Sequence, residues 1–226
     1  MHLIIRKAAL ISFTFLAFLT ISCSRQGNGT TASNRPLAVP QIISNKPKIM
    51  AFGDSLTAGF GLLEKESYPY LLQEKLKADG YDYEVVNAGV SGETTLGGLE
   101  RIDWVLETEN IKILILELGA NDLMRGVPVA KVKANLDTII RKAKARNVRV
   151  LLCGMLAPPG TDYGRDFTVI FPDLASEHKV DFLPFLLENV ALKKELNQAD
   201  GIHPNSEGER IMTDNVYRAL RPMLSK

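Results

Sequence analysis

The chain has 226 residues, of which 46% are hydrophobic and 23% charged, and its formal net charge is +1. That composition excludes collagen-like, fibrous and wholly disordered proteins, and the length suits about one folded domain. Residues 48–226 carry 22 basic and 26 acidic side chains, a net charge of −4, so the body of the chain lacks the basic surface that nucleic-acid binding requires.

The first 22 residues are typical of an export signal. Arg6 and Lys7 precede the apolar run AALISFTFLAFLTI at 8–21, and Ser22 follows it. The run is shorter than the ~20 residues that a membrane-spanning helix needs. We therefore expect residues 1–22 to be a signal peptide rather than a retained anchor helix, and the protein to be exported.

The segment LTISC at 19–23 resembles a bacterial lipoprotein signal, in which cleavage precedes a cysteine that becomes lipidated. The resemblance implies that Cys23 carries lipid and anchors the protein in a membrane, on its periplasmic or cell-surface side. A plain secretory signal, leaving a soluble secreted or periplasmic protein, is the alternative. Residues 23–47 are rich in Gly, Ser, Asn and Pro and are expected to form a flexible tether.

The other cysteine, Cys153, ends the apolar run VLLC at 150–153. We expect a buried, inert thiol and no disulfide, because a lipidated Cys23 is not available for pairing.

From residue 48 onward, short apolar runs alternate with segments of helical periodicity. Strands are predicted at 49–52, 84–87, 113–118, 148–155 and 180–183, and helices at 68–78, 129–145, 167–177 and 207–224. The run at 113–116 is continuously apolar, as in a strand buried on both faces of a parallel sheet. The alternation predicts one α/β domain at 48–226, with helices on both faces of the sheet.

Four polar motifs follow these elements where a ligand site is expected, beyond the carboxyl ends of the strands. GDSL at 53–56 follows the first strand, NAGVSG at 87–92 the second and GAND at 119–122 the third, and DGIHP at 200–204 precedes the last helix. Each motif alone also suits a turn or a helix cap. Their order and placement together indicate one site.

The chemistry that these residues suit is acyl transfer. Ser55 needs a base within hydrogen-bond reach, and His203 is the candidate, with Asp200 three residues earlier placed to orient its ring. The Ser55 N–H, the Gly89 N–H and the Asn121 side-chain amide are candidate donors to the oxyanion of a tetrahedral intermediate.

With Ser55 in GDSL, Gly89 in NAGVSGETT, Asn121 in ELGANDLMRG and His203 in DGIHPN, the sequence resembles the SGNH (GDSL) hydrolases across essentially all of 48–226. It is most similar to the thioesterase I, arylesterase and lysophospholipase branch. The resemblance implies a flavodoxin-like three-layer α/β/α sandwich around a five-stranded parallel sheet. It also implies a Ser55–His203–Asp200 catalytic triad, an oxyanion hole of Ser55, Gly89 and Asn121, and no metal or other cofactor.

One local departure from the branch concerns residues 160–162, which make the loop between APP and YGR about one residue longer than expected. In relatives this loop helps to line the acyl pocket, so the acyl-length preference is the property that does not carry over from the resemblance.

Other polar and aromatic candidates are given structural roles. His178 is expected to be a solvated side chain at a helix end, Trp104 to lie in a helix core, and Asp54 and Asp122 to accept hydrogen bonds in loops. No G-x-S-x-G elbow, Walker loop or dinucleotide-binding fingerprint is present.

The sequence thus predicts a monomeric serine esterase for small to medium acyl esters, acting through an acyl-enzyme. Lysophospholipids and other carboxylic esters rank above acyl-CoA thioesters as substrates, because an exported enzyme meets lipids more readily. Two alternatives stay open: a carbohydrate acetyl esterase, and a non-catalytic surface lipoprotein that binds a ligand.

Overall fold

The computed structural model describes residues 45–226. The predicted signal peptide at 1–22, the lipidation site Cys23 and all of the tether but its last three residues lie outside the described residues. Among the helices of residues 45–226, none has the length and apolar character needed to cross a bilayer.

Five parallel strands form one sheet in the order β2-β1-β3-β4-β5. They are β1 (Lys48–Gly53), β2 (Glu84–Gly89), β3 (Ile111–Glu117), β4 (Arg149–Cys153) and β5 (Asp181–Leu183). This is the flavodoxin-like strand order, in which the crossover reverses between β1 and β3. The predicted fold class and all five predicted strands are confirmed.

Burial along the strands follows their position in the sheet. Every residue of β1 after Lys48 is buried, and β3 is buried except at Lys112, because helices cover both faces of the central strands. The edge strand β2 has no fully buried residue, and its Asn87 is exposed. Cys153, at the end of β4, is a buried free thiol, as predicted.

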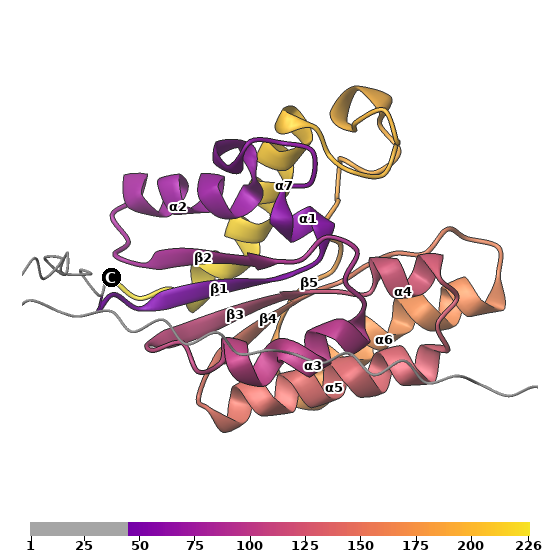
Figure 1. Ribbon diagram of the computed structural model, residues 1–226, viewed down its shortest axis with the longest axis horizontal. Coiled ribbons are helices and arrows are strands. Elements are labelled where there is room, and N and C mark those ends of the chain that lie inside the picture. Colours follow the sequence, from indigo (N-terminus) through magenta and orange to yellow (C-terminus); the bar gives the residue numbers. More distant parts are fainter. Residues whose placement is uncertain (1–44) are drawn as a thin grey trace, which may run out of the picture. The chain divides into compact units, whose positions relative to one another are not determined.

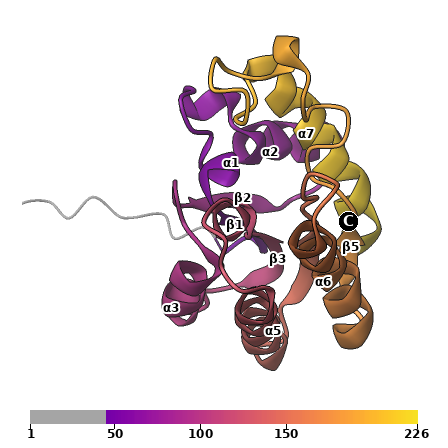
Figure 2. The same ribbon diagram turned by 90° about the vertical axis from the view of Figure 1, so that its right-hand side faces the viewer.

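The helices form two layers around the sheet (Figures 1 and 2). One face carries α2 (Tyr68–Ala78) and α7 (Ser206–Leu220), and the other carries α3 (Thr95–Val105), α5 (Val129–Ala145) and α6 (Asp162–His178). Two short helices, α1 (Ser55–Ala58) and α4 (Ala120–Met124), begin where β1 and β3 end. Single 3₁₀ turns lie at Glu64–Glu66, Lys194–Leu196 and Arg221–Met223.

The predicted bounds of α2 and α5 are confirmed, and other elements differ at their ends. Helix α6 begins at Asp162 rather than 167, because the Thr161 side chain accepts from the Gly164 N–H and caps it. Helix α7 ends at Leu220, and the predicted residues beyond it form the 3₁₀ turn that contains Pro222. Strand β4 ends at Cys153 rather than 155, and the N–H of the next residue, Gly154, donates to the Leu183 carbonyl at 2.7 Å.

Three predictions outside the site are wrong. Trp104 is 73% exposed on α3, rather than in a helix core. His178 is largely buried rather than solvated, with its Nε2 2.7 Å from Asp137 Oδ1 on α5. Residues 45–47 are not free tether, because the Asn45 carbonyl accepts from the Asn110 side chain and the Pro47 carbonyl accepts from the Glu84 N–H.

A buried carboxyl joins the two helices on one face of the sheet. Glu209 of α7 is 1% exposed, and its Oε2 accepts from the N–H of Tyr68, the first residue of α2, at 2.8 Å. Burial raises the pKa of Glu209 to about 8. The folded protein therefore holds this group largely neutral at pH 7, where the unfolded chain ionises it.

We expect Glu209→Gln to become more stable relative to the parent as pH rises from 5 to 8. Because the folded pKa is raised, the stabilising contribution of Glu209 is complete below about pH 4 and declines as pH approaches 8. The parent should lose on the order of 3 kcal/mol relative to the variant across that range. Urea unfolding at pH 5 and pH 8 measures it, with the exposed Glu207→Gln as control. Parallel pH dependence in all three proteins would contradict the assignment.

Candidate active site

The structure brings Ser55, His203 and Asp200 together at the carboxyl end of the sheet. Ser55 is the first residue of α1, directly after β1, and Asp54 caps that helix by accepting from the Leu56 N–H at 3.0 Å. His203 Nε2 lies 2.9 Å from Ser55 Oγ, and its Nδ1 lies 2.7 Å from Asp200 Oδ2. The three side chains thus form a continuous hydrogen-bonded line.

Asp200 is held by its own loop. Its Oδ1 accepts from the N–H groups of Ile202 and His203, each at 3.0 Å, which leaves Oδ2 for the imidazole. These backbone bonds, with the His203 side chain, lower the pKa of Asp200 to about 2. The carboxylate is therefore charged throughout the neutral range, as a partner that stabilises an imidazolium must be.

The Phe60 ring packs against the His203 imidazole. Its centroid lies 4.7 Å from that of His203, with the planes tilted by 39°. A contact of this kind restricts ring rotation and shields one face of the base from water.

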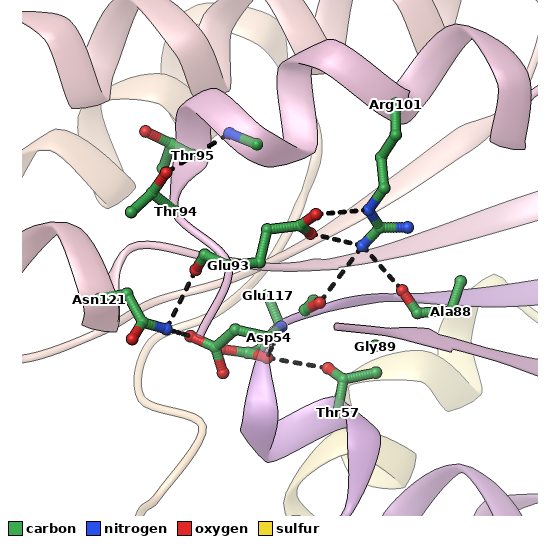
Figure 3. Close-up of polar contacts among 12 residues, drawn as sticks. Asp54, Thr57, Ala88, Gly89, Glu93, Thr94, Thr95, Arg101, Glu117 and Asn121 are labelled. Atoms are coloured by element: carbon green, nitrogen blue, oxygen red, sulfur yellow. Dashed lines mark hydrogen bonds and ion pairs between the residues drawn. The ribbon is translucent and has the colours of Figure 1, made fainter. Parts of the chain in front are cut away.

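Two of the three predicted oxyanion donors lie at the site. Within residues 45–226 the Ser55 N–H has no protein acceptor, as expected at the first position of a helix. The Asn121 Nδ2 group donates to Asp54 Oδ2 and to the Glu93 carbonyl, each at 3.0 Å (Figure 3). Both amide hydrogens are engaged, so Asn121 must share or release one to meet an oxyanion.

Gly89, the third predicted donor, does not have a free N–H. Its N–H donates to Asn87 Oδ1 at 3.0 Å, and Gly89 does not line the groove beside Ser55. A Cβ at Gly89 would lie 2.3 Å from the Ala58 nitrogen, so glycine is needed there for packing against α1. The prediction mistook a packing glycine at the end of β2 for a donor.

Gly92 is the candidate that sequence reasoning missed. It has φ 80° and occupies the third position of the turn at 90–93, which the Glu93 N–H closes onto the Val90 carbonyl. A turn of that shape requires positive φ, hence glycine. In the described part of the chain the Gly92 N–H has no backbone or side-chain acceptor, and the next residue, Glu93, contacts Asn121. The signal available in the sequence was the Ser91–Gly92 pair after the strand.

The carboxyl group of Glu117 lies next to Asp54, the residue that caps α1. At the end of β3 and fully buried, it accepts at Oε2 from the Asp54 N–H at 3.1 Å and from Thr57 Oγ1 at 2.8 Å. Burial and the neighbouring Asp54 raise the pKa of Glu117 well above its usual range, and burial raises the pKa of Asp54 to about 6. Glu117 is therefore the neutral member of the pair and supports the start of α1.

The roles predicted for Asp54 and Asp122 as hydrogen-bond acceptors are confirmed. Asp122 accepts from the N–H and the hydroxyl of Thr95, at 2.8 and 2.7 Å, and so fixes the start of α3.

An apolar groove of about 180 Å³ opens beside Ser55. Its walls come from α4, the segment after β4 and the loop before α7, and the side chains that form most of them are Leu123, Met124, Met155, Leu156, Phe185, Leu187, Leu192 and Ile202. Several of these are half-exposed or more, so the groove opens to solvent. It suits an acyl chain whose carbonyl carbon meets Ser55.

Residues 160–162 do not line this groove. Thr161 caps α6 and Asp162 begins it, and both border a separate surface hollow together with Ala157 and Arg165. The extra residue in this loop therefore does not touch the groove at Ser55, although the resemblance implied a loop that helps to line the acyl pocket. No described residues form a group of three or more His, Cys, Asp or Glu side chains that could hold a metal ion.

Comparison with known proteins shows which families and sequences the chain as a whole resembles. Residues 51–211 match the model of the GDSL-like Lipase/Acylhydrolase family. The chain is 38% identical over 178 residues to esterase TesA of Pseudomonas aeruginosa, covering 78% of this chain and 89% of TesA. It is 35% identical to an arylesterase of Vibrio mimicus over 175 residues, covering 76% and 88% of the two chains.

A further relative is thioesterase 1/protease 1/lysophospholipase L1 of Escherichia coli, 35% identical over 179 residues and covering 78% of this chain and 85% of the relative. Among solved structures, a crystal structure of TesA superposes with a TM-score of 0.76 at 38% identity and covers 78% of this chain and 99% of its own.

Proposed function

The chain belongs to the GDSL-like lipase/acylhydrolase family and is a serine esterase, and we propose that Ser55, His203 and Asp200 are its catalytic residues. Ser55 Oγ attacks the acyl carbonyl while His203 Nε2 takes its proton, and His203 then gives that proton to the leaving alcohol. Water then attacks the acyl-enzyme while His203 Nε2 takes its proton. His203 gives that proton to Ser55 Oγ as the carboxylic acid leaves. The 2.9 Å contact between Nε2 and Oγ carries this proposal.

The oxyanion of each tetrahedral intermediate is proposed to meet the Ser55 N–H, the Asn121 side chain and the Gly92 N–H. Gly92 replaces Gly89 in this assignment. Two observations support Gly92 as a donor. Its N–H has no acceptor among the described residues, and the carbonyl of the next residue, Glu93, accepts from the Asn121 side chain. Three donors aimed at one oxygen would stabilise the charge that develops in the transition state.

The proposed substrates are carboxylic esters with small to medium acyl chains, including aryl esters and lysophospholipids. The names of the relatives span arylesterase, thioesterase and lysophospholipase, and the apolar groove beside Ser55 suits the acyl part of each. Lysophospholipids and other oxygen esters rank above acyl-CoA, because the signal-like segment at 1–22 would take the enzyme away from cytosolic thioesters.

We also propose that the protein is exported through residues 1–22 and held at a membrane by lipidated Cys23, with the following segment as tether. The support is the sequence LTISC and the polar composition that follows it. The hydrolase domain is proposed to act as a monomer.

The substrate proposal is tested with p-nitrophenyl esters from acetate to palmitate, alongside lysophosphatidylcholine and palmitoyl-CoA. We expect the rate to rise beyond acetate, because the apolar walls of the groove beside Ser55 cover more of a longer acyl chain. Faster hydrolysis of palmitoyl-CoA than of lysophosphatidylcholine would overturn the ranking. Activity confined to acetyl esters would favour a carbohydrate acetyl esterase, and no turnover by folded protein would favour the non-catalytic lipoprotein.

A further inference from the structure

The segment that carries the proposed Gly92 donor is held in place through Glu93. The Glu93 N–H closes the turn at 90–93, and its carbonyl accepts from Asn121 at 3.0 Å. The Glu93 side chain is 7% exposed, and its carboxylate points away from Asn121, toward α3 (Figure 3). One residue therefore links the turn, the Asn121 amide and a buried ionic contact.

The partner of that carboxylate is Arg101 of α3. The guanidinium donates from Nε to Glu93 Oε1 at 2.6 Å and from Nη2 to Glu93 Oε2 at 2.5 Å. This is a two-point contact between a side chain that is 19% exposed and one that is 7% exposed. Charge-assisted pairs of this form fix direction as well as distance.

Arg101 also contacts the sheet. Its Nη2 donates to the Ala88 carbonyl at 2.8 Å and to the Gly53 carbonyl at 3.3 Å, and its guanidinium carbon lies 3.9 Å from the centre of the Phe52 ring. Gly53 and Ala88 belong to the ends of β1 and β2, and β1 leads directly into Ser55. The arginine therefore ties the turn to the carboxyl ends of β1 and β2.

From the opposite side, α4 holds the same segment. Asn121 binds the Glu93 carbonyl, and the neighbouring Asp122 binds Thr95 at both its N–H and its hydroxyl. Residues 93–95 are thus fixed between α4 and Arg101. Removing the arginine would leave the buried Glu93 carboxylate without its charge partner and free the turn on one side.

We propose that Arg101 is a positioning residue for ester hydrolysis: acting through Glu93, it holds the Gly92 N–H and the Asn121 amide in the geometry that stabilises the oxyanion. The inference rests on the proposed function. Arg101 does not line the groove beside Ser55, so we expect its effect to fall on the transition state rather than on substrate binding. Lysine cannot reproduce it fully, because one ammonium cannot span both carboxylate oxygens and the two strand carbonyls at once.

The test compares full-chain parent, Arg101→Met and Arg101→Lys by kcat and KM for p-nitrophenyl butyrate. We expect Arg101→Met to lower kcat about 10–100-fold with KM changed less than about threefold, and Arg101→Lys to fall between it and the parent. The pH dependence of the rate should keep its shape, because His203 is untouched. An unchanged kcat in Arg101→Met would overturn the proposal.

A double-mutant cycle with Asn121→Ala separates positioning from general damage. If Arg101 acts through the oxyanion site, Arg101→Met should cost much less in the Asn121→Ala background than in the parent. Equal fold-losses in both backgrounds would also overturn the proposal.

Arg149→Met is the matched control. Arg149 likewise joins a carboxylate, Asp181 Oδ2 at 3.0 Å, to a backbone carbonyl, Met223 O at 2.9 Å, but it lies at the start of β4, at the other end of the sheet. The kcat of Arg149→Met should match that of the parent. If Arg101→Met does not fold, Arg101→Met combined with Glu93→Gln removes both charges and is measured instead. An active Ser55→Ala would refute the proposed function itself, whereas an inactive Ser55→Ala beside a fully active Arg101→Met refutes only this inference.

Discussion

Ser55→Ala is expected to lower kcat for p-nitrophenyl butyrate by about 10⁴-fold or more, with the protein folded and KM within a few-fold of the parent. Alanine removes the Oγ that lies 2.9 Å from the His203 imidazole and leaves the backbone N–H and the apolar groove in place. The variant should therefore bind the ester but form no acyl-enzyme.

Initial rates and mass spectrometry of the protein after a substrate pulse measure the two effects. The parent should show an acyl adduct and Ser55→Ala none. Ser176→Ala, an exposed serine on α6, is the control and should behave as the parent does. Activity in Ser55→Ala within tenfold of the parent would remove Ser55 as the nucleophile.

The sheet was predictable because its central strands are apolar on both faces. Runs such as Ile113 to Leu116 are continuously apolar and have no amphipathic pattern. Such a run by itself indicates a parallel strand that is buried on both faces. Their ends then place GDSL and GAND at one edge. Helix ends were less accurate where the cap is a local polar contact, as with Thr161 at the start of α6.

The choice between two glycines shows where sequence reasoning stopped. The predicted second strand ended at Asn87, which left Gly89 in a loop and free to donate. In the structure β2 continues to Gly89, whose neighbour α1 comes too close for any side chain, while Gly92 occupies the turn beyond. Which glycine serves packing and which serves the turn depends on that contact with α1, 31 residues or more away along the chain.

Polar partners that are distant in sequence were missed for the same reason. His178 looked solvated because its neighbours in the chain are polar, yet Asp137 from α5 binds its ring. Glu117 and Glu209 lie fully buried in segments predicted from their apolar residues, and no local pattern marks them as buried carboxyls. Trp104 is exposed because it lies on the outer side of α3, and periodicity alone did not fix that side.

Asp200→Asn tests the third member of the proposed triad, and we expect it to lower kcat by about 10³–10⁴-fold at pH 8. The amide oxygen of the substituted side chain would keep the two backbone bonds now made by Oδ1, so its NH₂ would face His203 Nδ1. An NH₂ in that place favours the tautomer with the proton on Nε2. That nitrogen would then donate to Ser55 Oγ instead of accepting its proton.

The charge of Asp200 does not change over the range of the assay. Hydrogen bonds from the backbone and from the His203 ring lower the pKa of Asp200 to about 2, so in the parent the carboxylate stays ionised above about pH 4, and its stabilising contribution is lost only as pH falls below that. The loss of kcat in Asp200→Asn at pH 8 is therefore a loss of an ionised, oriented partner of the imidazole. Initial rates at pH 8 measure this loss, with the exposed Asp162→Asn as control, which should behave as the parent does. A kcat of Asp200→Asn near that of the parent would mean that Asp200 neither orients the imidazole nor stabilises its charge.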